Sequence, residues 1–429
     1  MSKVDVDGQL ELIPPKGLRG RVRQIGPGLL AAATGVGAGD LVATMVAGAR
    51  FGTVLLWAAV AGTILKLALG EGVGRWHLAS GTTLLDGWRR LGRWATTFFG
   101  AYIVIWGFVY GATAMSAVGL PLNALFGGLP VRYWAMIAGV AGLLLVWAQR
   151  YHAFEKFMTV LVLFKFVTVV SIAVLVSPNL GDLAGGLVPR LPDGSTIYVL
   201  GLVGGVGGTI TMAAYGYWMF AKGWRGTGWL SMMRLDNAVG YVMTGVFVVA
   251  MLVVGSTMLF GQDLTAGDDG LLTLGAALGE EYGQWARVWF LIGFLAVTSS
   301  SLLGVWNGVS MMFADWTRQL RLPHGKDADS TPGERPVGVE RSTPFRAYLL
   351  WLTFPPMALL FMDKPFGLTL VYGLLGSVFM PFLAITLMLL LNSQKVAAQG
   401  RSGWLSNGLL GAASLLFTAL LVADVAGRF

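Results

Sequence analysis

The sequence predicts an all-α polytopic membrane protein with eleven transmembrane helices. Of its 429 residues, 55% are hydrophobic and 12% are charged, about half the charged share of an ordinary soluble domain. Apolar runs of roughly 18 residues or more, long enough to cross a bilayer, recur along the chain. This composition excludes a soluble enzyme, a nucleic-acid-binding module and a disordered scaffold. Because the chain has no cysteine, it also lacks a disulfide framework, a thiolate metal site and a cysteine nucleophile.

The apolar segments follow a polar N-terminal stretch, residues 1–25. They lie near residues 27–49, 52–70, 95–120, 131–148, 157–177, 197–221, 238–260, 285–313, 346–361, 366–392 and 404–424. Lys and Arg gather in every second loop, beginning with the residues that precede the first segment. Under the positive-inside rule, this pattern predicts a bacterial-type inner membrane protein with a cytoplasmic N-terminus and an external C-terminus.

The order of the segments predicts two inverted halves. Residues 26–180 would form the first repeat of five helices, residues 196–392 the second, and residues 403–429 an additional eleventh helix. Because five crossings is an odd number, the second repeat enters the membrane inverted, as in many secondary transporters. The longest polar stretch, 317–345, is rich in Pro, Gly, Ser and mixed charge, which indicates a cytoplasmic loop.

Glycine clusters in the first and sixth segments predict a break in each helix. They are residues 34–40 and 204–216. Each Gly costs a helix interior about 1 kcal/mol relative to Ala, and unwound backbone at that depth persists only against protein or a hydrated cavity. Close helix packing is the alternative for either cluster alone, but their matched positions favour a binding site. The residues expected to line this site are Thr34, Gly35, Gly37, Ala38, Gly39, Asp40, Gly208, Thr209, Thr211, Met212 and Tyr215.

The first helix resembles that of the Nramp metal transporters. Residues 26–30 (Gly-Pro-Gly-Leu-Leu), 37–40 (Gly-Ala-Gly-Asp) and 47–52 (Ala-Gly-Ala-Arg-Phe-Gly) carry the resemblance, and residues 298–304 look like the family's Gln-Ser-Ser-Thr stretch. The resemblance covers most of the chain. It implies the LeuT-type fold, in which two inverted five-helix repeats surround a central site between broken helices 1 and 6.

The chain departs from that family at the positions that bind metal. Where the family carries Asp-Pro-Gly-Asn in helix 1, this chain has Gly37-Ala38-Gly39-Asp40, and where it carries Met-Pro-His in helix 6, this chain has Thr211-Met212-Ala213. The stretch that matches the family's acidic helix 3, residues 111–119, has no ionisable group. Thioether and imidazole ligands favour transition metals. We therefore expect no typical proton-coupled uptake of Mn²⁺ or Fe²⁺, no resident metal and no cofactor.

These departures leave three functions open. A small, donor-rich pocket favours a transporter of a small inorganic anion, with bicarbonate as the leading candidate, working by alternating access with Na⁺ or H⁺ as coupling ion. The alternative is a hard divalent cation, Mg²⁺ or less favourably Mn²⁺, held by Asp40 and backbone carbonyls, although Asp40 also suits a helix cap. A sensor or scaffold that kept the fold is the third. The sequence shows no pairing of a nucleophile with a general base, so we do not expect an enzyme. The expected partners are the transported ion and the lipid bilayer. The oligomeric state is left open, with a monomer plausible.

Two lysines lie inside apolar segments. Lys165 is about 12 Å into the fifth segment, where a charge is costly and usually functional. It could attract an anion, pair with Asp40, or take the place of a coupling Na⁺, for which Thr298, Ser299 and Ser300 are the candidate hydroxyl ligands. Lys66 is nearer the end of its segment, so we expect it to snorkel toward the cytoplasm.

Overall fold

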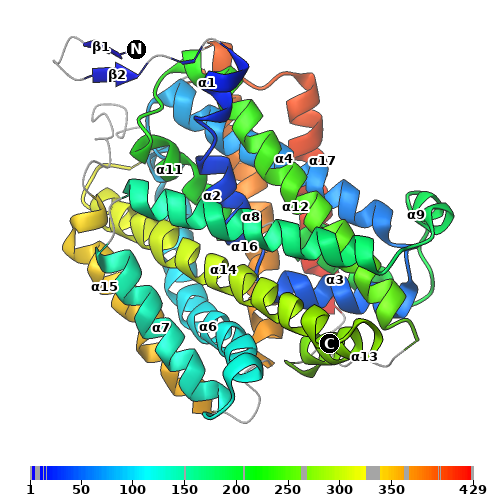
Figure 1. The fold of residues 1–429 in the computed structure, drawn as a ribbon. Coiled ribbons are helices and arrows are strands. Elements are labelled where there is room, and N and C mark those ends of the chain that lie inside the picture. The colour runs from blue at the N-terminus through cyan, green and yellow to red at the C-terminus, as the bar shows by residue number, and fades with distance from the viewer. Residues whose placement is uncertain are drawn as a thin grey trace.

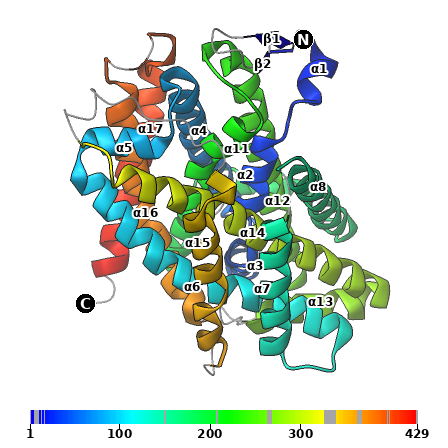
Figure 2. The same ribbon diagram turned by 90° about the vertical axis from the view of Figure 1, so that its left-hand side faces the viewer.

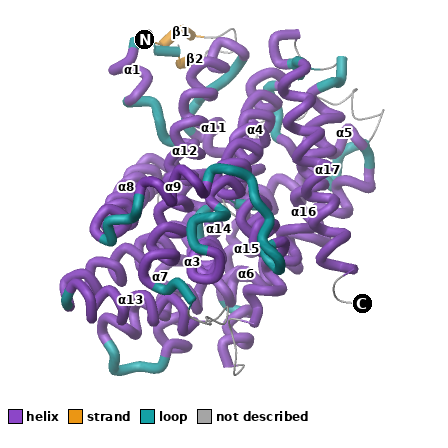
Figure 3. The backbone as a smooth tube through the Cα atoms, turned by 90° about the vertical axis from the view of Figure 1, so that its right-hand side faces the viewer, coloured by secondary structure: helices purple, strands orange, loops and turns teal. Residues whose placement is uncertain are grey.

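Helices form nearly all the regular structure of the chain (Figure 3). The computed structural model describes every residue except 1, 5–9, 13, 16, 149–150, 206–207, 262–267, 325–338, 362–366, 395, 397 and 427–429. Much of the predicted loop 317–345 therefore lies outside the described residues. In the described part, each of the eleven expected segments coincides with helix. The strands β1 (Ser2–Val4) and β2 (Leu10–Leu12), a short antiparallel pair, are the exception to an all-helical fold.

Six of the described helices are long and apolar enough to cross a membrane, and a bent helix pair would make a seventh span. The six are α4 (Leu56–Ser80), α6 (Arg93–Phe126), α7 (Val131–Ala148), α8 (Tyr151–Leu175), α12 (Leu230–Met258) and α14 (Gln284–Gln319). The chain is a membrane protein. The N-terminal strands lie at one end of the bundle, and α17 (Trp404–Ala426) ends toward the other (Figure 2).

Both predicted helix breaks are present. The first helix consists of α2 (Pro27–Gly35) and α3 (Ala38–Phe51), whose axes differ by 60°. The sixth consists of α10 (Thr196–Leu200), a π-helical turn η1 (Gly201–Gly205), a 3-10 turn η2 (Ile210–Ala214) and α11 (Tyr215–Ala221). Extended backbone at Val36 and Gly37 separates α2 from α3, so the first cluster of glycines does interrupt its helix.

Shorter elements complete the bundle. Segments nine and ten form α15 (Thr343–Thr353), η6 (Pro355–Phe361) and α16 (Gly367–Leu391). The connections carry α1 (Leu18–Val22), α5 (Leu84–Leu91), α9 (Leu180–Gly186), α13 (Asp268–Tyr282), η3 (Thr227–Trp229), η5 (Val339–Arg341) and η7 (Ala398–Gly400). Local chemistry sets several of their ends: the Thr83 and Ser342 hydroxyls cap α5 and α15, and Gly81 ends α4 in the left-handed region.

Glycines let the first helix pack closely on α12 (Figure 1). A Cβ atom at Gly28 would lie 2.2 Å from the Asp236 carbonyl oxygen, and one at Gly240 would lie 2.3 Å from the Gly28 carbonyl oxygen. In α3, a Cβ at Gly48 would lie 2.2 Å from the Leu252 carbonyl oxygen. Such backbone-to-backbone contact is how helices associate where no hydrophobic force separates them from lipid. The broken helix is therefore held against α12 along both of its halves.

Candidate functional site

The two helix breaks meet in the middle of the bundle. Gly208, at the break of the sixth helix, has a positive φ of 88°. A Cβ atom there would lie 3.0 Å from the Gly35 Cα at the end of α2, and 2.6 Å from the Thr211 hydroxyl oxygen. Glycine is needed at this point for both its backbone conformation and the close approach. The geometry brings the two predicted clusters together.

Asp40 lies at the start of α3, one turn after the break. Its Oδ2 accepts a hydrogen bond of 2.7 Å from the Gly37 backbone N–H, so the carboxylate caps this half-helix. Within the described residues, Oδ1 has no hydrogen-bond partner. Asp40 and its neighbours Gly37 and Gly39 are half-buried, whereas residues 26–36 are buried. Asp40 thus places a carboxylate at the break of the first helix.

The carbonyl groups at the end of α2 are held by side chains from α8 and α14. The Lys165 ammonium donates to the Ala33 carbonyl oxygen at 3.0 Å and to the Ser300 hydroxyl at 3.3 Å. Ser301 donates to the Thr34 carbonyl oxygen at 3.1 Å and shares a 2.8 Å hydrogen bond with the Tyr110 hydroxyl of α6. Of the three candidate hydroxyls of α14, Ser300 therefore reaches the break. Thr298 donates to its own helix at the Phe294 carbonyl, and Ser299 is half-buried beside it.

Lys66 does not snorkel, which corrects the expectation from its position. Its side chain is 1% exposed. The ammonium donates to the Gly208 carbonyl oxygen at 2.5 Å, lies 3.6 Å from the Met380 sulfur, and sits 5.7 Å from the centre of the Phe417 ring. The reason is that Lys66 lies on the face of α4 that packs on the sixth helix, where the break offers a carbonyl without a helical partner. The sequence analysis missed this contact. The position of Lys66 inside an apolar segment, like that of Lys165, was the feature that could have indicated a buried partner.

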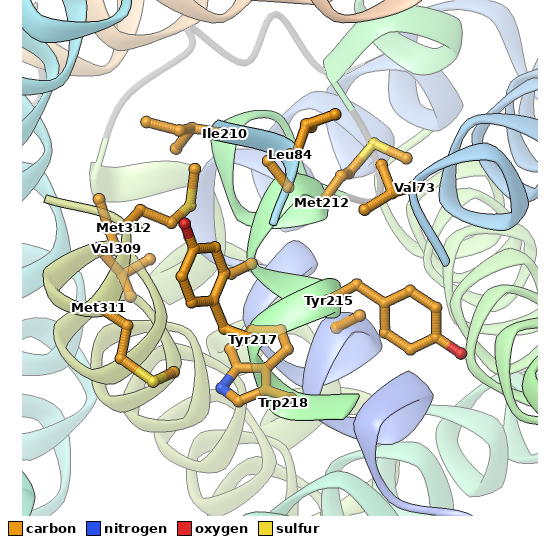
Figure 4. Close-up of a cluster of buried hydrophobic side chains, with 14 of the residues drawn as sticks. Val73, Leu84, Ile210, Met212, Tyr215, Tyr217, Trp218, Val309, Met311 and Met312 are labelled. Atoms are coloured by element: carbon orange, nitrogen blue, oxygen red, sulfur yellow. The ribbon is translucent and has the colours of Figure 1, made fainter. Parts of the chain in front are cut away.

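Other expected site residues point elsewhere. The Tyr215 hydroxyl donates to Asp236 Oδ2 at 2.9 Å and to the Met233 carbonyl at 3.2 Å, near the start of α2 rather than at its break. Met212 packs beside Val73 in the hydrophobic core (Figure 4).

The hydroxyls expected near the break differ in their bonding. Thr34 donates to its own helix at the Leu30 carbonyl, whereas the buried Thr209 hydroxyl has no partner in the described structure. Thr211 is buried next to Gly208. The Ala38 side chain lies outside the described residues.

A second polar cluster fixes the start of α2. Both oxygens of the buried Asp236 carboxylate accept backbone N–H groups of the first helix, from Gly26 at 2.9 Å and from Gly28 at 2.6 Å. Lys222, at the end of α11, forms an ion pair with Glu155 of α8 and donates to the Ile25 carbonyl oxygen at 3.3 Å. A carboxylate at the N-terminus of a helix satisfies free N–H groups and complements the helix dipole. Side chains from α12, α11 and α8 therefore hold the N-terminal end of α2 in place.

No group of three or more His, Cys, Asp or Glu residues able to hold a metal ion occurs among the described residues. The oxygen atoms present at the two breaks are those of the Asp40 carboxylate, of the Ala33, Thr34 and Gly208 carbonyls and of nearby hydroxyls. These are hard oxygen ligands.

Comparison with known proteins identifies relatives across most of the chain. The family model "Natural resistance-associated macrophage protein-like" (Nramp) matches residues 28–426. A protein of Mycobacterium tuberculosis named divalent metal cation transporter MntH is 26% identical over 302 residues, covering 67% of this chain and 69% of its own. The protein of that name in Deinococcus radiodurans is 27% identical over 312 residues, covering 70% of each.

Two solved structures share the fold. A mutant of the Eremococcus coleocola manganese transporter superposes with a TM-score of 0.80 at 14% identity, covering 97% of this chain and 89% of its own. MHP1, a nucleobase-cation-symport-1 family transporter, superposes with a TM-score of 0.55 at 16% identity, covering 94% and 93%. At these identities the likeness concerns the fold alone. It agrees with the LeuT-type arrangement expected from the broken first and sixth helices.

Proposed function

This chain belongs to the Nramp family, and from that premise we propose that it carries a divalent metal cation across the membrane by alternating access. The observation that supports this proposal most directly is the Asp40 carboxylate at the break of the first helix, because the end of α2 at that break meets Gly208 of the sixth helix. Carbonyl groups released at both breaks accept hydrogen bonds from Lys165, Ser301 and Lys66. The relatives named as divalent metal cation transporters support the same substrate class.

The expectation of a bicarbonate transporter is wrong. Relatives across two thirds of the chain are named divalent metal cation transporters. The physical error lies in the backbone donors that were assigned to an anion. The Gly37 N–H at the start of α3 is bonded to Asp40, a negative charge of the chain itself.

Oxygen ligands favour a hard ion. Carboxylate, carbonyl and hydroxyl groups suit Mg²⁺ and Mn²⁺, while the softer ligands that favour later transition metals are thioether and imidazole. Met212 is packed in the core, and helix 6 has Ala213 in place of a histidine. We therefore infer that Mg²⁺ and Mn²⁺ compete for one site. We also keep the orientation proposed from the charges of the loops, with the N-terminus in the cytoplasm of a bacterial cell.

Uptake into liposomes tests this function. We expect the purified protein, reconstituted into liposomes that contain a Mn²⁺-quenched dye, to give saturable quenching above that of protein-free vesicles. External Mg²⁺ should reduce the rate by competition. A rate equal to that of protein-free vesicles for both Mn²⁺ and Mg²⁺ would overturn the proposed function.

The Thr34→Val variant tests whether the Thr34 hydroxyl binds the transported ion. The hydroxyl donates to the Leu30 carbonyl of its own helix, and a side chain at this position packs against Gly304. Valine keeps that shape and loses only a local hydrogen bond. We expect Thr34→Val to retain Mn²⁺ uptake within about twofold of the wild type. A loss of tenfold or more, with Thr34→Ser unaffected, would instead place the hydroxyl on the ion.

A further inference from the structure

The short helix α1 buries none of its side chains in the protein. Gly17 at its start provides no side-chain cap, and Leu18 and Val22 are 75% and 56% exposed. The helix stands at the edge of the bundle, beyond the start of α2 (Figure 2). A single helical turn of this kind is marginal in water by itself. Its helical form therefore indicates a stabilising surface outside the chain.

The neighbours of α1 place it at the border of the lipid-facing surface. On α8, the exposed apolar residues begin with Phe157 and continue with Val160. Glu155 lies two residues before Phe157 and forms an ion pair with Lys222. The Lys222 ammonium also donates to the Ile25 carbonyl oxygen at 3.3 Å, and Ile25 follows shortly after the end of α1. This contact connects the end of α1 to the edge of the apolar surface that faces lipid.

The side chains of α1 are distributed as in a helix that lies flat on a membrane. Leu18 and Val22 are one turn apart, so they share a face. Arg23 continues the helical backbone, and at 3.6 residues per turn Arg19 and Arg23 flank the apolar face on one side and Arg21 on the other. Interfacial helices have this pattern, because long basic side chains reach the headgroups while their stems lie on apolar surface.

The charges of this segment fit an anionic surface. Residues 17–25 include three arginines and no acidic residue. Within the described part of the chain, none of these arginines is paired with a carboxylate, and the exposed Lys156 adds a positive charge at the edge of α8. A guanidinium group binds phosphate oxygens through two parallel hydrogen bonds. Each basic residue near an anionic leaflet strengthens association about fivefold.

A lipid surface accounts for both the charged and the apolar residues of α1. Free phosphate or a nucleic acid would pair with the arginines and leave Leu18 and Val22 in water. An apolar peptide would cover those two side chains and leave the arginines without partners. The bilayer presents phosphate groups and acyl chains at adjoining depths, and it already meets α8 beside this segment. The observations therefore favour the membrane itself as the partner.

We propose that α1 is a membrane-surface anchor, in which Arg19, Arg21 and Arg23 bind anionic phospholipid headgroups while Leu18 and Val22 enter the acyl region. Because α2 begins at Pro27, shortly after the last of these arginines, the same contact positions the chain that enters the first broken helix. The anchor does not depend on which ion is transported, so its test requires no transport assay.

A single fluorescent label on α1 tests the proposal, since the chain has no cysteine of its own. Val22→Cys is labelled with an environment-sensitive dye in the purified full-length protein. Nanodiscs contain either phosphatidylcholine alone or phosphatidylcholine with about one third phosphatidylglycerol. We expect the emission to shift to the blue and to rise at least about twofold in the anionic nanodiscs, with a smaller difference at high salt. Equal emission in the two compositions overturns the proposal, and blue-shifted emission in both would indicate apolar contact alone.

Charge variants in the labelled protein test the three arginines. With Arg19→Gln, Arg21→Gln and Arg23→Gln combined, emission should be the same in both compositions. The corresponding lysine triple variant should keep part of the difference, because it retains charge without the paired geometry. Arg190→Gln removes an exposed arginine that follows α9 and should leave the lipid effect unchanged.

A lipid effect that survives in the glutamine triple variant would place the anionic headgroups elsewhere and overturn the proposal. Because α1 buries no side chain, its substitutions should leave the fold intact, which size-exclusion profiles verify. If the triple variant fails to fold, the three single glutamine variants provide the test. Each should reduce the difference between the two lipid compositions, and three unchanged single variants would equally overturn the proposal.

Discussion

Exchange of Asp40 for asparagine is expected to reduce Mn²⁺ uptake by at least about 100-fold, because it removes the one carboxylate that the described residues place at the break. Loss even of an outer partner of a metal ligand costs about 10- to 100-fold, and Asp40 is proposed as a direct ligand. The asparagine oxygen can still accept the Gly37 N–H that Asp40 accepts now. The variant should therefore keep its fold. The measurement is the initial uptake rate in liposomes, together with the apparent Tm in detergent.

Two further variants separate an ion ligand from a helix cap. If Asp40 were only a cap, asparagine would transport like the wild type, and Asp40→Ala would lose stability by about 1 kcal/mol. If Asp40 binds the ion, both variants lose transport, and only alanine loses stability. Asp182→Asn, on the exposed helix α9, is the matched control for removal of one negative charge. Wild-type uptake by Asp40→Asn would show that the ion lies elsewhere.

Local signals in the sequence were enough to predict the breaks. Glycine weakens a helix through its own backbone, so the clusters at residues 34–40 and 204–216 mark their breaks without any knowledge of the neighbours. Long apolar runs likewise locate the spans. The meeting of Gly35 with Gly208 follows from the resemblance to a LeuT-type fold rather than from either cluster alone.

The direction of a side chain could not be predicted in this way. Residue number gives the depth of Lys66 in its span, but the face it occupies depends on how α4 is rotated against the sixth helix. Tyr215 shows the same limit: it belongs to the glycine-rich stretch, yet the helix has resumed there and its hydroxyl bonds to Asp236. The pocket expected to be rich in donors has its Gly37 N–H occupied by Asp40, a residue three positions further along the chain.

The choice of substrate failed for a different reason. The substitutions at Gly37, Thr211 and Ala213 say which ligands are missing, and a missing ligand does not specify the sign of the charge that the site binds. That sign depends on which backbone groups point toward the break. The groups in place there are the Asp40 carboxylate, the Lys165 and Lys66 ammonium groups and the carbonyls that these lysines hold, so the names of the relatives rather than the missing ligands identify the substrate class.

Replacement of Gly28 by valine should destabilise the protein more than any exposed substitution, because it separates α2 from α12. A Cβ at this position would lie 2.2 Å from the Asp236 carbonyl oxygen and 2.9 Å from its Oδ2. Backbone atoms cannot rotate away as a side chain can. Overpacking of this kind costs about 1–3 kcal/mol. The displaced helix would also lose the N–H bonds of Gly26 and Gly28 to Asp236, each worth about 1.5–3 kcal/mol with a charged acceptor.

If α2 is displaced, overpacking and the loss of the two hydrogen bonds together lower the free energy of unfolding by at least about 4 kcal/mol. The apparent Tm of Gly28→Val in detergent should fall well below that of Gly411→Val, since a Cβ at Gly411 in α17 meets no atom within 4 Å. The chain has no cysteine, so a single Leu29→Cys change reports on the same event. Leu29 is 7% exposed, and its thiol should react with maleimide faster when Gly28→Val or Asp236→Ala is added. Equal Tm values and equal labelling rates would mean that α2 does not depend on its contact with α12.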